Sequence, residues 1–136
     1  MVRCLFRLLL VLWAGSLWSL AAWVAPTLFH AQSDRQLAGI LAARLFSIET
    51  YVGLGAAVFA LLLPERGSFR WGYVAAGLLA VNEWVLKPVM TAAHTAGTAA
   101  GLSFGAWHGV AAVIYVGACV AVAVPILRIS TLRGGG

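Results

Sequence analysis

Four long apolar runs divide the chain, and short polar segments separate them. The runs cover about residues 8–29, 37–63, 71–90 and 103–127. Each is close to the roughly 20 residues that an α-helix needs to cross the hydrocarbon core of a bilayer. No segment shows the alternating pattern of a half-buried strand. The pattern predicts an all-α integral membrane protein, a bundle of four transmembrane helices forming a single membrane domain over residues 1–136.

The composition favours the same class of protein. Hydrophobic residues make up 62% of the 136-residue chain, and charged residues only 10%. A soluble domain of this size could not bury so much apolar surface in one core, so lipid should be the solvent for most of it. The two cysteines, Cys4 and Cys119, provide neither a disulfide framework nor the ligand spacing of a metal site. We expect both to be packing residues.

The first run has two interpretations. Arg3 and Arg7 precede it, and such a charged front could also begin a signal peptide. We prefer a retained helix because the run is long, carries three tryptophans and lacks a clear cleavage site of small residues. Pro26, near the far end of the run, should kink or finish this helix.

The formal net charge of +5 lies at the chain ends and in one connection. Arginines flank the first and last runs, and the segment Glu65–Arg70 adds one further positive charge. These charges are not clustered as a nucleic-acid site requires, so nucleic acid is not an expected partner. The positive-inside rule places both termini and the Glu65–Arg70 connection in the cytoplasm. We therefore expect an N-in/C-in protein of a bacterial inner membrane.

Among the polar or titratable side chains inside the apolar runs, seven are candidates for a buried polar cluster. They are Arg44, Glu49, Asn82, Glu83, Lys87, His108 and Tyr115. At about 1.5 Å per residue, Arg44 and Glu83 should both lie roughly 10 Å below the outer boundary. Charges inside a membrane are costly unless they are paired or functional. The matching depth predicts an ion pair between Arg44 and Glu83, with Asn82, Lys87 and His108 at a similar level.

This predicted polar cluster has two interpretations. It could be a structural network that holds the helices together, because polar contacts stabilise helix packing in lipid. Alternatively, it could line a cavity open to the outside that acts on a substrate, a proton or a metal. Glu49 has the same two interpretations, as a neutral structural carboxyl group or as a proton carrier. The pattern does not decide between them.

Neither a cofactor nor an enzymatic activity is expected. His30, His94 and His108 all map near the outer face and are the candidate metal ligands, but their spacing resembles no known ligand set. We predict no metal site and no haem. The sequence also lacks a nucleophile elbow, a phosphate-binding loop and an HExxH motif, so soluble-type enzyme chemistry has no support.

The segment between the third and fourth runs is rich in Ala, Gly and Thr. Gly97, Gly101, Gly105 and Gly109 recur every four residues and could form one face of a long helix. We prefer a loop to about Gly101 and a helix afterwards, because so many glycines weaken the start of a helix. An internal repeat of the first two runs in the last two is conceivable, but the residues show no convincing match.

Several short stretches resemble one known family over nearly the whole chain. They are Gly15-Ser16-Leu17, Val24-Ala25-Pro26-Thr27-Leu28-Phe29, Ala38-Gly39, Leu45-Phe46 with Tyr51, Asn82 with Pro88, and Trp107-His108-Gly109. The chain resembles the domain-of-unknown-function family numbered 4149, with its transmembrane protein 205-like relatives. The resemblance implies a compact four-helix integral membrane protein and no established activity. One departure is that Val110, Ala111 and Ala112 stand where a small polar residue is expected after the histidine.

The sequence thus predicts a small integral membrane protein that is not an enzyme. Its expected role is that of a non-enzymatic membrane component or accessory subunit. Its expected partners are the lipid bilayer and either another membrane protein or a second copy of the chain. The alternative is a small transporter-like protein that handles a proton or a metal through an outward-facing polar cavity.

Overall fold

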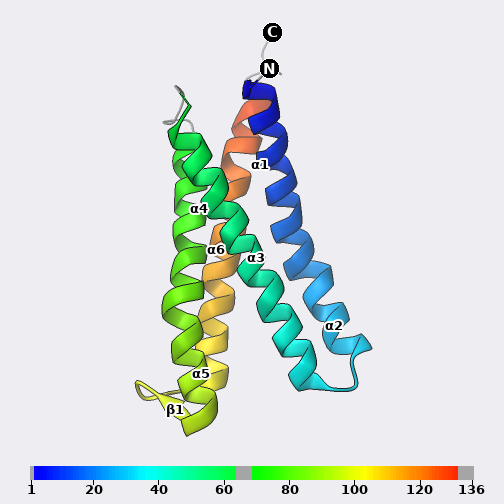
Figure 1. Ribbon diagram of the computed structural model, residues 1–136, viewed down its shortest axis with the longest axis vertical. Coiled ribbons are helices and arrows are strands. Elements are labelled where there is room, and N and C mark those ends of the chain that lie inside the picture. Colours follow the sequence, from blue (N-terminus) through cyan, green and yellow to red (C-terminus); the bar gives the residue numbers. More distant parts are fainter. Residues whose placement is uncertain (1, 64–68, 132–136) are drawn as a thin grey trace. The chain divides into compact units, whose positions relative to one another are not determined.

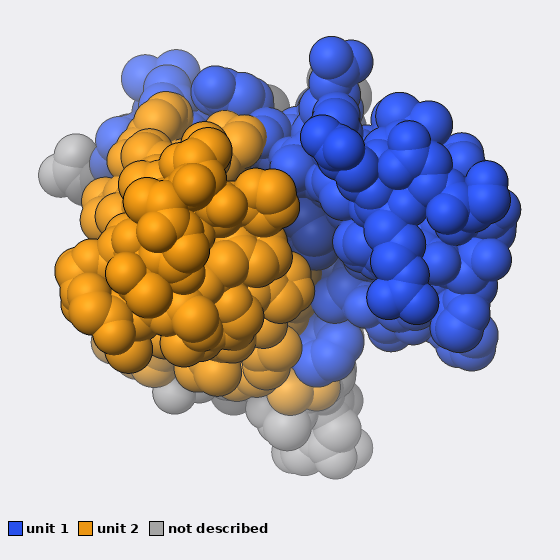
Figure 2. All heavy atoms as spheres, turned by 90° about the horizontal axis from the view of Figure 1, so that it is seen from below, with its two compact units in different colours: residues 1–66 blue, residues 67–136 orange. Residues whose placement is uncertain are grey.

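The computed structural model describes residues 2–63 and 69–131. The chain forms two compact units, residues 1–66 and residues 67–136, which are coloured separately in Figure 2. A membrane domain can contain several such units, so the single domain expected from the sequence stays a prediction. Residues 64–68, which include Glu65 of the connection expected in the cytoplasm, lie outside the described residues.

The first unit is a helical hairpin. Its elements are α1 (Val2–Ser19), a π-helical turn η1 (Leu20–Val24), α2 (Ala25–Ala31) and α3 (Arg35–Leu61). The carboxylate of Asp34 caps α3 by accepting hydrogen bonds from the backbone N–H groups of Gln36 and Leu37. Such a cap satisfies donors that the first helical turn leaves open. The chain therefore turns after Ala31, and α1 and α2 pack against α3 (Figure 1).

The second unit repeats this plan with a longer connection. Its elements are α4 (Arg70–Val81), a π-helical turn η3 (Asn82–Leu86), α5 (Lys87–Ala96), β1 (Thr98–Ala99), β2 (Leu102–Ser103) and α6 (Phe104–Thr131). The two short strands pair antiparallel. Both α4 and α5 pack along α6 (Figure 1). All four helical segments predicted from the apolar runs are present among the described residues.

Each π-helical turn ends two residues before a proline. The N–H of Ala25 bonds to the carbonyl of Leu20, and the N–H of Lys87 bonds to that of Asn82. A proline inside a helix removes one N–H and pushes its ring towards the carbonyl four residues earlier. One wider turn before Pro26 or Pro88 gives that ring space, and the helix continues. Pro26 therefore does not finish the first helical segment, which runs on to Ala31.

The buried positions of the two units also correspond. Each first helix buries residues at the spacing i, i+3, i+4 and i+7, and the last of them stands three residues before the π-helical turn. In α1 and α4 these residues are Leu10, Trp13, Ala14 and Leu17, and Gly72, Ala75, Ala76 and Leu79. Residue size differs at half of these positions, which is why comparing the residues alone revealed no repeat. The two units therefore share the order of their helical elements and the spacing of their buried residues, although the amino acids at these positions differ.

The glycine-rich segment is a hairpin between two helices. Gly97 and Gly101 have positive φ angles of 83° and 79°, which side chains rarely tolerate. The indole N–H of Trp107 donates a hydrogen bond of 2.9 Å to the carbonyl of Ala99, which ties the hairpin to α6. The preferred loop up to about Gly101 is confirmed, and the alternative of one long glycine-faced helix is wrong. The two-residue strands were not expected.

Three helical segments in the described part of the chain are long and apolar enough to cross a membrane. They are Cys4–Ala31, Arg35–Leu61 and Phe104–Val124. Large apolar side chains such as Leu12, Trp23 and Val113 are about 70% exposed, as expected where lipid is the solvent. The predicted all-helical fold is therefore confirmed, and three of the four predicted spans have the length and hydropathy that a membrane crossing needs. The remaining segment, Arg70–Ala96, is less apolar because it contains Asn82, Glu83 and Lys87.

Candidate functional site

The charges of the third helical segment pair with each other. Glu83 stands in η3 and Lys87 begins α5, one turn further on. The ammonium nitrogen of Lys87 lies 2.6 Å from Oε1 of Glu83, and the two side chains are 41% and 13% exposed. A glutamate four residues before a lysine is the favourable order for a helical ion pair. The pair leaves this stretch with no net charge.

Asn82 connects the same stretch to the neighbouring helix. Its side-chain amide donates a hydrogen bond of 3.2 Å to the backbone carbonyl of Ala111 in α6. That carbonyl lies inside a helix, where its own helical bond leaves one acceptor position free. Asn82 therefore fixes η3 against α6 through a polar contact of the kind that holds helices together in lipid.

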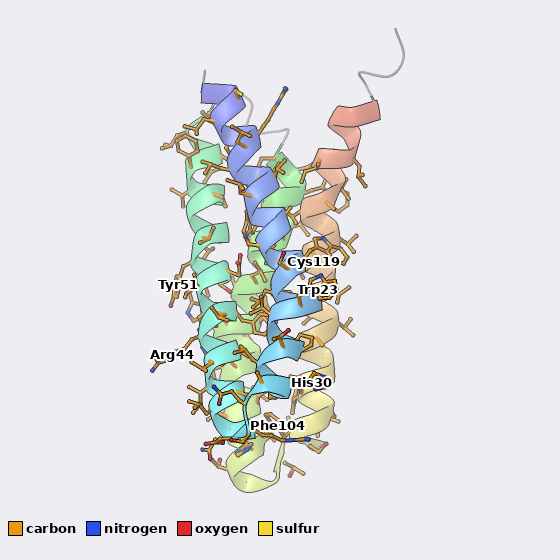
Figure 3. The ribbon with its side chains drawn as sticks, turned by 90° about the vertical axis from the view of Figure 1, so that its right-hand side faces the viewer. Trp23, His30, Arg44, Tyr51, Phe104 and Cys119 are labelled. Carbon is orange, nitrogen blue, oxygen red and sulfur yellow. The ribbon has the colours of Figure 1, made fainter. Side chains whose placement is uncertain are left out.

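Arg44 lies on α3 in the first unit. Its side chain is exposed, and Figure 3 shows it directed away from α1. Tyr51, two turns further along α3, is also exposed, at 58%. Because Arg44 and Glu83 belong to different units, their predicted ion pair stays a prediction. Glu83 has Lys87 as a partner within its own unit.

The two histidines of the second unit pack on one aromatic ring. The ring of Phe104 lies 5.2 Å from that of His94, edge to face, and 6.0 Å from that of His108, nearly parallel. Both imidazoles are exposed at the hairpin end of α6. Within residues 2–63 and 69–131 no group of three or more histidine, cysteine or acidic residues could hold a metal ion. His30 lies in α2 of the first unit.

Tyr115 does not join these histidines. It is buried, with 5% of its surface exposed, two helical turns beyond His108 on α6. His108 is exposed near the hairpin end of α6, whereas Tyr115 lies in the buried part of the same helix. Within the second unit, the structure brings Glu83 and Lys87 together and joins Asn82 to α6.

Glu49 has a partner that the sequence did not reveal. In the first unit, Oε2 of Glu49 lies 3.0 Å from the hydroxyl oxygen of Ser16 on α1. The same hydroxyl oxygen lies 2.8 Å from the backbone carbonyl of Trp13. Ser16 could not be identified beforehand, because the register between α1 and α3 decides which serine of α1 meets Glu49. A small hydroxyl residue in an apolar helix was the only available signal.

A buried donor lies on the same two helices. The indole ring of Trp13 is 2% exposed and packs on Gly53, one turn after Glu49 on α3. Its Nε1 atom is buried and has no hydrogen-bond partner in the described part of the chain. The first unit therefore contains a carboxyl group, a hydroxyl group and an unused N–H donor within one helical turn of one another along α1 and α3.

These groups can exchange protons and form hydrogen bonds. Comparisons with curated proteins and with solved structures gave no match. A family match covers residues 8–99, which include most of α1, the elements from η1 to α5 and the start of the hairpin. The description of that family specifies no activity. The chain belongs to this family, described as Domain of unknown function (DUF4149).

Proposed function

We propose that this chain is a four-span protein of a bacterial inner membrane, with both termini in the cytoplasm, and that it serves as a non-enzymatic component or accessory subunit. Its partner would be another membrane protein or a second copy. The observation that carries the proposal is that the polar groups of the third helical segment have partners inside their own unit. Lys87 lies against Glu83, and Asn82 bonds to the carbonyl of Ala111.

The ion pair between Glu83 and Lys87 makes the third helical segment more suitable for crossing a membrane. A charged side chain at the centre of a membrane helix costs about 2.5–3.5 kcal/mol on insertion scales. An ion pair one turn apart presents a dipole instead of two separate charges, and the cost falls. The segment Arg70–Ala96 contains 27 residues in one helical path, the same number as α3. Its length therefore supports a crossing of the bilayer.

A structural role and a transport role differ in the access of water. A transporter needs a wet cavity that reaches Glu83 or Asn82, whereas a structural contact needs a dry helix interface. Ala111 reports on this difference, because it is 7% exposed and accepts the bond from Asn82. We therefore choose Ala111→Cys, in a background in which Cys4→Ser and Cys119→Ala remove the native thiols.

The experiment labels intact cells with a membrane-impermeant maleimide. Ala111→Cys should remain unlabelled in intact cells and become labelled after denaturation, because maleimide reacts with a hydrated thiolate. Ser33→Cys, in the exposed connection before α3, is the positive control, and the fully buried Ala75→Cys is the negative control. Labelling of Ala111→Cys from outside would overturn the structural proposal and favour the transporter-like alternative.

A further inference from the structure

The carboxyl group of Glu49 occupies the middle of two candidate spans. It is the fifteenth of the 27 residues of α3, and Ser16 stands near the middle of the span Cys4–Ala31. At about 1.5 Å per residue, Glu49 is roughly 20 Å from either end of its helix. Its side chain is partly buried, in a helix that is long and apolar enough to cross a membrane. This environment disfavours a carboxylate and favours a protonated carboxyl group.

The hydrogen-bond geometry at Ser16 requires one more proton than the serine provides. Its hydroxyl oxygen lies within hydrogen-bond distance of two oxygens, 2.8 Å from the carbonyl of Trp13 and 3.0 Å from Oε2 of Glu49. A hydroxyl group has one proton to donate and can also accept. If Ser16 donates to the closer carbonyl of Trp13, the contact with Glu49 needs a proton from the carboxyl group. Both contacts are satisfied together only when Glu49 is protonated.

The ionised form also has donors available. When Glu49 loses its proton, the hydroxyl group of Ser16 can rotate away from the carbonyl of Trp13 and donate to the carboxylate. The carbonyl of Trp13 keeps its place in the helix. The indole N–H of Trp13, one turn away on the same helix, is buried and has no partner among residues 2–63 and 69–131. A site that serves both protonation states can take up and release a proton instead of holding it permanently.

Among the described side chains of the first unit, the other titratable groups lie away from the contact between Glu49 and Ser16. On the helices packed against α3, the titratable residues with described side chains are Cys4, Arg7 and His30. Arg7 is nine residues before Ser16 and His30 is fourteen residues after it, about 13 Å and 21 Å of helix rise. On α3 itself, Arg44 and Tyr51 are exposed and directed away from α1 (Figure 3).

We propose that Glu49 and Ser16 form a membrane-embedded proton-binding site, with Glu49 protonated at neutral pH. This inference goes beyond the proposed function, because a purely structural component needs no group that exchanges protons. It shares with that proposal only the crossing of the membrane by α1 and α3. Labelling of Ala111→Cys tests the second unit, so the failure of one proposal is distinguishable from the failure of the other.

Dicyclohexylcarbodiimide, a hydrophobic reagent, tests the site in membranes that contain the full chain. It reacts with a protonated carboxyl group: the acid proton moves to one carbodiimide nitrogen and the carboxyl oxygen bonds to the central carbon. An oxygen-to-nitrogen acyl shift then gives a stable N-acylurea, and no group leaves. Peptide mass spectrometry should find the adduct on Glu49 at neutral pH, with labelling that decreases as the pH rises.

The matched variants are Glu49→Gln and Glu83→Gln. Glu49→Gln should lose the adduct, whereas Glu83→Gln should keep it, because Glu83 forms an ion pair with Lys87 and is not part of the proposed site. An adduct of equal yield in Glu49→Gln, or a wild-type chain unlabelled at Glu49, would overturn the proposal. Protection by sodium ions at constant pH would also overturn it, since the site would then bind a metal cation.

Infrared spectroscopy of the wild-type chain keeps the test independent of the folding of any variant. A protonated carboxyl group has a carbonyl stretching band that shifts on exchange into D₂O. We expect this band at neutral pH in the wild type and in Glu83→Gln. Its absence from the wild type would overturn the proposal, even if Glu49→Gln failed to fold.

Discussion

The indole ring of Trp13 lies directly against Gly53 on the neighbouring helix, and a β-carbon at Gly53 would overlap the ring. Trp13 is among the largest fully buried side chains in the described structure. The glycine permits α1 and α3 to approach closely, as small residues do at helix contacts in membranes. The same contact sets the register that brings Ser16 to Glu49.

Substituting Gly53→Ala should destabilise the chain. The added methyl group meets the rigid edge of an indole ring, and overpacking of this kind costs typically about 1–3 kcal/mol. The free energy of unfolding in detergent micelles is the measurement. Gly55→Ala is the matched control on the same helix, because no atom lies within 4 Å of its added β-carbon. Equal stability of the two variants would show that Trp13 and Gly53 are not in contact.

The hydrogen bond from Asn82 to Ala111 should contribute modestly to stability. Interhelical hydrogen bonds in membrane proteins average about 0.6 kcal/mol and reach about 1.7 kcal/mol. Asn82→Leu should therefore lower the free energy of unfolding within this range. Thr91→Ala is the control, because Thr91 bonds only within its own helix to the carbonyl of Lys87. A larger loss for Thr91→Ala than for Asn82→Leu would contradict this assignment.

The pair of Glu83 and Lys87 should behave as one unit in a double-mutant cycle. Glu83→Gln leaves an ammonium group unpaired in an apolar helix, and Lys87→Met leaves a carboxylate unpaired. The double variant removes both charges and should be less destabilised than the sum of the single variants, by about 0.5–3 kcal/mol for residues in contact. Additive free energies of unfolding would show that the two side chains do not interact, and would reopen the pairing of Glu83 with Arg44.

The fold could be predicted from the sequence wherever hydrophobicity alone decides. All four helical segments follow from the length of the apolar runs, with ends within a few residues of those observed. The exceptions are the first segment, which begins at Val2 instead of near Leu8, and the third segment, which continues from Met90 to Ala96 before the hairpin begins. The polar and small residues after Met90 gave no apolar signal, although alanine is the best helix former.

The candidate site was less predictable, because it depends on which side chains meet. Spacing along one helix was sufficient to bring Glu83 and Lys87 together. The partners of Asn82 and Glu49 stand 29 and 33 residues away from them in the chain, and only the packing of helices selects them. The π-helical turns were not predicted from the sequence either, although each stands just before a proline, Pro26 or Pro88.

The proposed topology has a direct test by cysteine labelling in the cysteine-free background. Ser33→Cys and Thr98→Cys stand in the two connections expected outside, and both side chains are exposed. They should react with an impermeant maleimide in intact cells. Arg66→Cys, in the connection expected inside, should react only after the cells are opened. The reverse pattern would place both termini outside and would contradict the orientation derived from the positive-inside rule.

Gly101 should be the residue on which the hairpin between α5 and α6 depends most. Its φ angle of 79° lies in the left-handed region, where a residue with a side chain costs roughly 1–2 kcal/mol. Gly101→Ala should therefore open the hairpin while α5 and α6 stay folded, because the strain is confined to a short connection. Hydrogen exchange at the amides of residues 98–103 measures this opening.

Gly109→Ala, inside α6 with open space around its added β-carbon, should leave the hairpin unchanged and stabilise the helix by about 0.5–1 kcal/mol. Unchanged hydrogen exchange in Gly101→Ala would show that the hairpin does not require glycine at this position.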